Sequence, residues 1–217
     1  MIKFLVKATS LIGLILSATG CVAVYNSQVR PGTVQYPSEI KHMVFVNFRT
    51  ESDVKYNFSN RSTYYWVKEF SLENEKTHAV KSFPLLWVFN VNEPFLRIPN
   101  QPNATITLPV LVSLEPGDYR VKDIDLECLA GASGNGYGVK PKGSILRFTV
   151  PDKDFCSLGT ICIEIKTKPP EERRFFDSFD GAEGISNIYA STRPVSPPEK
   201  DFAVQSFPFL KNLNLTP

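Results

Sequence analysis

The amino-acid sequence predicts a mainly β protein whose central part is an antiparallel β-sandwich of about 125 residues. Short apolar stretches, alternating or continuous, recur between residues 42 and 167 and are separated by turn-forming residues. The composition agrees, because 16 phenylalanines and 17 prolines against 2 methionines favour strands and turns over helices. We expect about seven to nine strands in this region, which suits a single sandwich domain.

The N-terminus has the layout of an export signal. Lys3 and Lys7 flank an apolar run that is too short to span a bilayer, and two small residues then precede Cys21. This arrangement is typical of a secretory signal peptide, which would cover residues 1–20.

A signal that ends in small residues and a cysteine resembles the lipobox of bacterial lipoproteins, although Ala18 stands where that pattern prefers leucine. The resemblance implies that Cys21 is acylated, with palmitate among its lipid chains, and anchors the mature protein to a membrane of the bacterial cell envelope. Val22 replaces the aspartate that would mark inner-membrane retention, so the resemblance implies the outer membrane. The alternative is an ordinary secretory signal that is cut elsewhere.

Residues 21–41 are expected to form a tether. They include Pro31, Gly32 and Pro37 and have few periodic apolar positions. About 20 residues span roughly 25 Å as a flexible coil, so the domain would stand clear of the membrane.

The mature chain is expected to be electrically neutral. Residues 1–20 hold two of the 24 basic residues and none of the 22 acidic residues, which leaves 22 of each sign. A neutral domain has no electrostatic basis for binding nucleic acid, so we expect no nucleic-acid partner.

The first strand is expected at residues 43–48, with odd-numbered side chains on one face and even-numbered side chains on the other. A second is expected at residues 64–70. Residues 85–91 are nearly continuously apolar, as in a strand covered on both faces, and residues 96–98 and 106–112 are shorter candidates. Several prolines restrict these segments to sheet edges or strand ends: Pro84, Pro94, Pro99, Pro102 and Pro109.

A turn at Pro116 and Gly117 precedes a strand that begins at Tyr119 and alternates as far as Cys128. This pattern resembles the tyrosine corner of Greek-key β-sandwiches, in which the phenol hydroxyl bonds to nearby backbone. The resemblance implies an immunoglobulin-like or Greek-key sandwich, although Val121 stands where immunoglobulin domains have a core cysteine.

Two further strands are expected at residues 145–150 and 155–166. In the second, three isoleucines alternate with more polar residues, as in a half-buried antiparallel strand. The glycine-rich loop at residues 131–138 is not followed by Gly-Lys-Ser/Thr, which favours a hairpin connection over a phosphate cradle. The sandwich domain would thus cover residues 42–167.

Residues 168–217 are expected to form a proline-rich C-terminal extension that is irregular and contains at most short helices. One such helix could begin at residues 169–172, because proline is accepted in a first helical turn. Residues 199–210 are unusually apolar for a free tail, so we expect them to dock on the sandwich or on a partner.

Three cysteines follow Cys21 in the chain: Cys128, Cys156 and Cys162. An exported protein meets an oxidising compartment, which predicts one disulfide and one free thiol. One unbroken strand would place Cys156 and Cys162 on the same face but about 20 Å apart, too far for a bridge. We favour Cys128 with Cys156, since both lie where a strand meets a connection. A bridge from Cys128 to Cys162, or a reversal at residues 157–160 that pairs Cys156 with Cys162, remains an alternative.

Candidate catalytic and metal-binding groups are few. His42 and His78 lie in no recognisable nucleophile motif, and the Cys-x5-Cys spacing has no nearby histidine to complete a zinc site. Asp123, Asp125 and Glu127 share one face of a strand, which we interpret as a solvated face rather than an acid–base or calcium site. We therefore expect no enzymatic activity, no metal and no cofactor.

Aromatic residues on the expected strands are the candidate ligand-binding residues: Tyr64, Tyr65, Trp66 and Trp87. Exposed rings could stack on sugar rings, whereas buried rings would belong to the core. The leading hypothesis is a membrane-anchored, non-catalytic lipoprotein that acts with a protein partner as an accessory or assembly component of the bacterial envelope. A glycan- or small-ligand-binding module is the alternative, and a hydrolase fits least.

Overall fold

The computed structural model describes residues 28–53, 65–85, 104–128, 146–168, 172 and 185–216. Several predicted features lie outside these residues, namely the signal peptide with Cys21, residues 86–98, the glycine-rich loop and residues 169–171.

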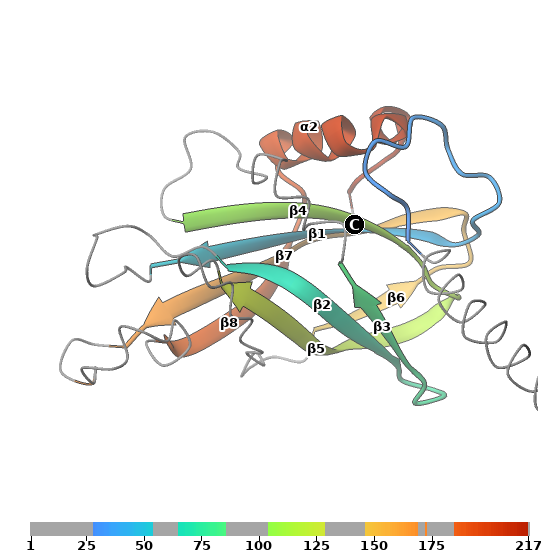
Figure 1. Cartoon of the computed structure of the whole chain (residues 1–217). Helices are drawn as coiled ribbons and strands as arrows, with labels where there is room; N and C mark the ends of the chain where they lie inside the picture. The colour runs from blue at the N-terminus through green and yellow to red at the C-terminus, as the bar shows by residue number, and fades with distance from the viewer. Residues whose placement is uncertain are drawn as a thin grey trace, which may run out of the picture.

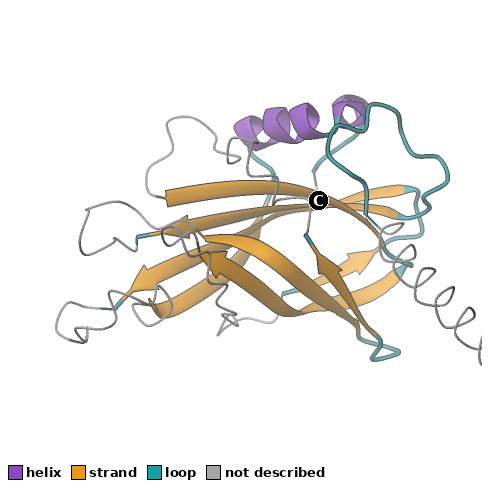
Figure 2. Cartoon of the chain, viewed as in Figure 1, coloured by secondary structure: helices purple, strands orange, loops and turns teal. Residues whose placement is uncertain are grey.

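In the described part of the chain, eight strands form two four-stranded sheets (Figure 1). The first sheet has the order β4-β1-β7-β8 and is built from β1 (Met43–Ser52), β4 (Ala104–Ser113), β7 (Phe155–Thr167) and β8 (Ile185–Arg193). The second sheet has the order β3-β2-β5-β6 and is built from β2 (Tyr65–Asn74), β3 (Val80–Pro84), β5 (Gly117–Cys128) and β6 (Arg147–Val150). Figure 2 shows that strands dominate, so the prediction of a mainly β protein is confirmed.

The first sheet is mixed. β1 pairs with β4 in antiparallel register from Met43↔Ser113 to Ser52↔Ala104, but it pairs with β7 in parallel. The expectation of wholly antiparallel strands is therefore wrong at this pairing. Parallel neighbours need a crossover connection, and here the chain crosses to the second sheet and builds β5 and β6 before it returns as β7.

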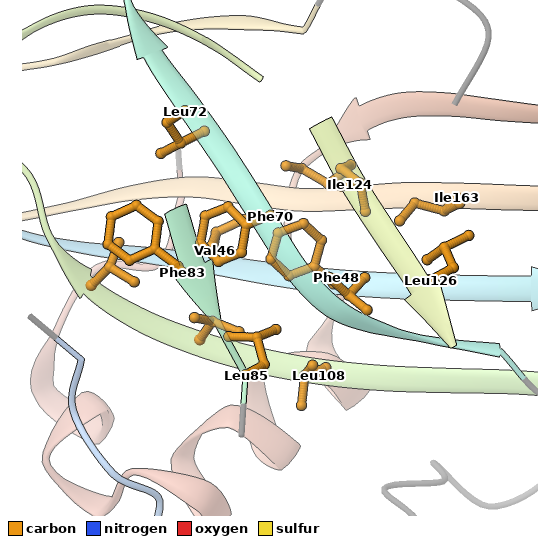
Figure 3. Close-up of a cluster of buried hydrophobic side chains, with 14 of the residues drawn as sticks. Val46, Phe48, Phe70, Leu72, Phe83, Leu85, Leu108, Ile124, Leu126 and Ile163 are labelled. Atoms are coloured by element: carbon orange, nitrogen blue, oxygen red, sulfur yellow. The ribbon is translucent and has the colours of Figure 1, made fainter. Parts of the chain in front are cut away.

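The side chains of β1 enter two separate hydrophobic clusters, as the predicted alternation requires. Val44, Val46 and Phe48 belong to the first cluster, which includes residues from all eight strands of both sheets. Met43 and Phe45 belong to the second cluster, on the outer face of the first sheet. Figure 3 shows part of the first cluster, including Val46 and Phe48 of β1 beside side chains of the second sheet.

Aromatic packing and one bulge position the second sheet over the first. The ring of Phe70 lies 5.0 Å from that of Phe48 in β1 and 4.9 Å from that of Phe83 in β3. The β2–β5 register shifts between Val67 and Glu69. Odd-numbered side chains of β2 therefore lie in the first cluster before this point and even-numbered side chains after it. This shift, which simple alternation did not predict, allows Phe70 to face the core together with Val67.

The prolines of the described strands lie where the sequence predicted. Pro109 lies in β4, which is an edge strand of the first sheet, and Pro84 ends β3, which is an edge strand of the second. Edge positions tolerate proline because its nitrogen has no hydrogen to donate to a neighbouring strand.

A bulge at Gly159 divides β7 into two parts. Even-numbered side chains face the first cluster before the bulge, and odd-numbered side chains face it after the bulge. Gly159 has a φ of +77°, and the β1–β7 register shifts between Phe45 and Asn47. Cys156 therefore packs against the first cluster, together with the buried isoleucines that follow the bulge, whereas Cys162 lies beside Arg193 and Glu199 on the other face. The prediction that the two cysteines share a face is wrong, because it assumed an unbroken alternation.

The C-terminal residues pack on the outer face of the first sheet. Helix α2 (Pro197–Ser206) and the 3-10 helix η5 (Pro208–Asn212) lie above this sheet, beside the N-terminal described segment (Figure 1). Their apolar side chains complete the second cluster, which joins Val29, Met43, Phe45, Leu111, Ala203, Phe207, Leu210 and Leu215. The apolar tail thus docks on its own sheet, and the expected tether is in contact with the sheet from Gln28 onward. Strand β8 lies in a region for which the sequence predicted no strand.

Tyr119 forms the expected corner. Its hydroxyl donates a hydrogen bond of 2.9 Å to the backbone oxygen of Glu115, and the residue is 6% exposed. Gly117 opens the strand at a φ of +152°, where a Cβ would lie 3.1 Å from the amide nitrogen of Asn74. The positive φ favours glycine at this turn, and any other side chain would also have to displace the end of the Asn74 side chain.

We expect a Tyr119→Phe substitution to lower the free energy of unfolding by roughly 0.5–1.5 kcal/mol, because one hydrogen bond is lost and the Glu115 carbonyl loses a partner. Chemical denaturation of both chains measures the difference. Equal denaturation midpoints for Tyr119→Phe and the unmodified chain would contradict a structural role for the hydroxyl.

Candidate functional site

The predicted aromatic residues that the structure describes are buried. Tyr65 is 1% exposed and faces the first cluster, and Trp66 is 8% exposed. Neither ring presents an open face on which a sugar could stack. Tyr64 and Trp87 lie outside the described residues.

The predicted Cys128–Cys156 disulfide is not formed, because Cys156 is a free thiol. The backbone pairing explains why. Cys128 lies opposite Tyr65, whose carbonyl accepts a 2.5 Å hydrogen bond from Thr50 near the end of β1. Cys156 lies opposite Val44 at the start of β1, so about six residues, roughly 20 Å, separate the two positions.

The two described thiols are poor nucleophiles. Burial raises the pKa of Cys156 to about 11. Burial also raises the pKa of Cys162, although the Arg193 guanidinium beside it acts in the opposite direction. Since the thiolate is the reactive form, neither side chain is suited to nucleophilic chemistry at neutral pH.

His78 does not lie beside the acidic face of β5. Ile124 and Leu126 are buried at 1% exposure, as predicted, but a register shift between Val121 and Asp123 breaks the alternation expected from Tyr119 onward. Glu127 is 9% exposed and so is less solvated than expected. His78 contacts Glu73 rather than this face. Glu73 lies opposite Arg120, seven residues or roughly 23 Å along β5 from Glu127.

Glu73 instead fixes the turn between β2 and β3. Both of its oxygens accept hydrogen bonds of 2.8 Å from Nη2 of Arg120, and Nδ1 of His78 lies 3.2 Å away. The hydrogen bond from Arg120, and then that from His78, hold the pKa of Glu73 below its usual value. A carboxylate held ionised in this way cannot serve as a general acid near neutral pH.

The described residues contain no cluster of three or more histidine, cysteine, aspartate or glutamate side chains that could hold a metal ion. Among the same residues, no helix is both long and apolar enough to cross a membrane.

The most elaborate polar arrangement surrounds Glu199 of α2, whose side chain is fully buried. Its Oε1 accepts a 2.6 Å hydrogen bond from Arg193 at the end of β8, and Oε2 accepts a second bond of 2.8 Å from the same guanidinium. Thr160 of β7 donates to Oε2 at 3.2 Å, and Arg49 of β1 lies 3.7 Å from Oε1. One carboxylate thus connects α2 to three strands of the first sheet.

The same carboxylate caps its own helix. Glu199 Oε2 accepts hydrogen bonds from the backbone nitrogen and the hydroxyl of Ser196, at 2.9 Å and 2.8 Å. Burial opposes ionisation of Glu199, but the hydrogen bonds from Arg193 and Ser196 outweigh it, so the pKa lies below its usual value. The sequence analysis missed this group. The signal was present, because Ser-Pro-Pro-Glu at residues 196–199 combines capping-box spacing with proline in the first turn.

Strand β8 is the candidate interaction surface. It ends the first sheet, and no strand in the described part of the chain pairs with its outer edge. Ile188 is 3% exposed and anchors the strand in the first cluster, whereas Tyr189 at its midpoint is 53% exposed. The Arg193–Glu199 pair fixes the C-terminal end of the strand against α2. Within the described residues, β8 thus ends the sheet as an unpaired strand edge with an exposed aromatic ring.

Comparison with known proteins adds little. No protein-family model and no curated protein matches the chain. Among solved structures, a leucine-rich repeat protein from Bacteroides thetaiotaomicron VPI-5482 shares 14% identity at a TM-score of 0.31, and the match covers 58% of this chain and 14% of that one. The chain therefore spans a small part of that protein, and a likeness at this level supports no conclusion about fold or function.

We expect Glu199→Gln to destabilise the protein by about 2–3 kcal/mol at pH 7, because Arg193 loses its buried counter-charge, whereas Arg49 keeps its ion pair with Glu51. The effect is smaller than for a fully enclosed pair, since the Arg193 side chain is 34% exposed and can regain water. Chemical denaturation as a function of pH measures it.

The pH dependence follows from the lowered pKa of Glu199. The carboxylate stabilises the fold when it is ionised. The difference in unfolding free energy between the unmodified chain and the Glu199→Gln chain should therefore shrink as the pH falls below about 4. The matched control is Glu164→Gln, where the carboxylate is 49% exposed and faces Lys166 at 3.3 Å, and we expect a change below about 0.5 kcal/mol. Equal effects of the two substitutions at pH 7 would contradict the role given to Glu199.

Proposed function

We propose that this protein is a bacterial envelope lipoprotein that is anchored by a lipid on Cys21. It acts by binding a protein partner rather than by catalysing a reaction. The N-terminal sequence supports the anchor, because basic residues, a short apolar run and small residues precede Cys21. By the lipobox resemblance, Val22 favours the outer membrane over the inner membrane.

The docking of the N-terminal segment limits how far the domain stands from the membrane. Val29 is buried in the second cluster, and Gln28 bridges to Val112 of β4. Only about seven residues join Cys21 to this contact, and even fully extended they span at most roughly 25 Å. The domain of a Cys21-anchored chain is therefore held near the lipid surface.

The state of the described polar groups supports a non-catalytic role. Glu73 and Glu199 are held as carboxylates by arginine side chains, and burial keeps the thiols of Cys156 and Cys162 protonated. These groups stabilise the structure and are poorly suited to general acid or nucleophilic chemistry.

The single observation that carries the protein-contact role is the outer edge of β8, which no other described strand pairs with. A strand edge offers backbone donors and acceptors to another strand, and proteins recognise extended segments in this way. The exposed ring of Tyr189 adds apolar contact area at the middle of this edge.

We further interpret the two sheets as a β-sandwich of Greek-key type. A hydrophobic cluster drawn from all eight strands supports face-to-face packing of the sheets. The corner at Tyr119 supports the same interpretation. The parallel β1–β7 pairing is a departure from a wholly antiparallel immunoglobulin-like form.

A Cys21→Ser substitution tests the anchor. We expect the precursor to remain uncut and to take up no labelled fatty acid, because the acyl acceptor is removed. Metabolic labelling and membrane fractionation measure both effects. Cys156→Ser is the matched control and should leave labelling unchanged, since Cys156 lies inside the domain, against the first cluster. Fatty-acid incorporation into the Cys21→Ser chain would contradict the lipoprotein assignment.

A further inference from the structure

We propose that two copies of this chain pair through their β8 strands, in antiparallel register about a twofold axis at Tyr189. The protein partner proposed above would then be a second copy of this chain, so the inference rests on that proposed function. It would join the two first sheets into one continuous sheet of eight strands.

The first argument is the contrast between β8 and the other edges of the described sheets. β4 contains Pro109, and its outer edge is partly covered by Gln28 and Val29. β3 has five residues and ends at a proline, and β6 has four residues. Short strands, proline and edge coverage are the devices by which proteins prevent edge pairing.

Strand β8 has none of these devices. Its nine residues, ISNIYASTR, include no proline, no lysine and no acidic residue, and the single charged residue, Arg193, lies at the last position. Among the described edges, β8 alone combines this length with the absence of proline and of a covering segment, and its single register shift lies near its N-terminal end, between Ile185 and Asn187. A long unprotected edge is expected to be paired in the functional state of the protein.

The second argument is the symmetry of the strand sequence about its midpoint. An antiparallel pairing centred on Tyr189 places Ile188 opposite Ala190 and Asn187 opposite Ser191. Over residues 187–191 apolar residues thus meet apolar residues and polar residues meet polar residues, whereas the outermost pair, Ile185 with Arg193, departs from this pattern. No like charges face each other. The exposed Tyr189 rings meet across the axis, and cross-strand aromatic pairs of this kind stabilise antiparallel strands.

This symmetry favours a second copy over an unrelated strand. A closed twofold contact requires that one surface be complementary to itself, and the polarity pattern of residues 187–191 has this property. A strand from another protein would place no such demand on the sequence around Tyr189.

The third argument is that β8 is already held in its pairing geometry. It is paired along its inner edge with β7 from Thr160↔Arg193 to Thr167↔Ile185. Ile188 fixes its inner face in the core, and the buried Glu199 fixes Arg193. Little conformational entropy is then lost when a second strand adds to the outer edge.

The geometry of the pairing also fits two chains anchored in one membrane. The twofold axis of an antiparallel strand pair is perpendicular to the sheet, so the outer faces of the two first sheets point to the same side. On this face lie α2 and the N-terminal described segment of each copy (Figure 1). Both N-terminal segments therefore leave the dimer on one side, and confinement to a membrane raises the effective concentration of each copy for the other.

A cysteine at the twofold axis tests the pairing in the full chain in native membranes. Directly opposed Cβ atoms of an antiparallel pair lie about 4.5–5.5 Å apart, near the range of a disulfide. We expect a Tyr189→Cys chain to shift under mild oxidation to a reducible band at twice the monomer mass. The matched control is Val80→Cys, a 46% exposed position on edge strand β3 of the other sheet, which should remain monomeric, as should the unmodified chain.

A second experiment tests the register without changing Tyr189. Co-expression of Asn187→Cys and Ser191→Cys chains with different tags should yield cross-links that join the two tags, because these positions face each other across the axis. A cross-link at equal yield in the Val80→Cys control, or no homodimer with Tyr189→Cys, would overturn the proposal.

A Tyr189→Cys adduct with a different protein would also overturn self-pairing. Fatty-acid labelling of the same samples reports the anchor separately, so a labelled chain without cross-links refutes only the dimer, and a cross-linked chain without label refutes only the anchor.

Discussion

The side chains of β1 are buried on both faces, and both of its edges are paired. Val44, Val46 and Phe48 lie in the cluster between the sheets, while Met43 and Phe45 are each 0% exposed on the opposite face. A strand buried on both faces needs a layer on each side. The second sheet supplies one layer, and α2, η5 and the N-terminal described segment supply the other. At about 1.5–3 kcal/mol for each large apolar side chain, leaving Phe45, Phe207 and Leu210 exposed would remove much of the stability of a domain.

The need to cover the outer face of the first sheet explains where the C-terminal segment lies. The contacts of that segment in turn hold the end of β8, the edge strand of the sheet. α2 must lie over the outer face of the first sheet, and Glu199 fixes it there by binding Arg193 of β8 and Thr160 of β7. The buried carboxylate also joins the end of β8 to α2 through Arg193. Attachment of the helix and the position of the end of β8 therefore depend on the same ion pair.

The features that the sequence predicted are those set by local chemistry. The alternation at residues 43–48 predicted the two faces of β1, and the Pro-Gly-x-Tyr pattern predicted the hydrogen bond of Tyr119. The prediction from alternation was wrong where a bulge exchanges the side chains that face the core and those that face away, as at Gly159 and between Val67 and Glu69. The position of such a bulge depends on the neighbouring strand, which the local sequence does not reveal. β8 was missed because its polar residues and the prolines that follow are typical of loops, and its strand structure comes from pairing with β7. The exposure of Tyr189 and the burial of Tyr65 likewise depend on which strands are neighbours.

The central claim is that the outer layer belongs to the same folding unit as β1. Hydrogen exchange followed by mass spectrometry, measured on the full chain at increasing denaturant, tests this most directly, because segments that open together lose protection together. The account predicts that peptides from α2 and η5 become unprotected in the same transition as peptides from β1. Exchange of α2 and η5 in a separate transition, at denaturant concentrations where β1 remains fully protected, would contradict it.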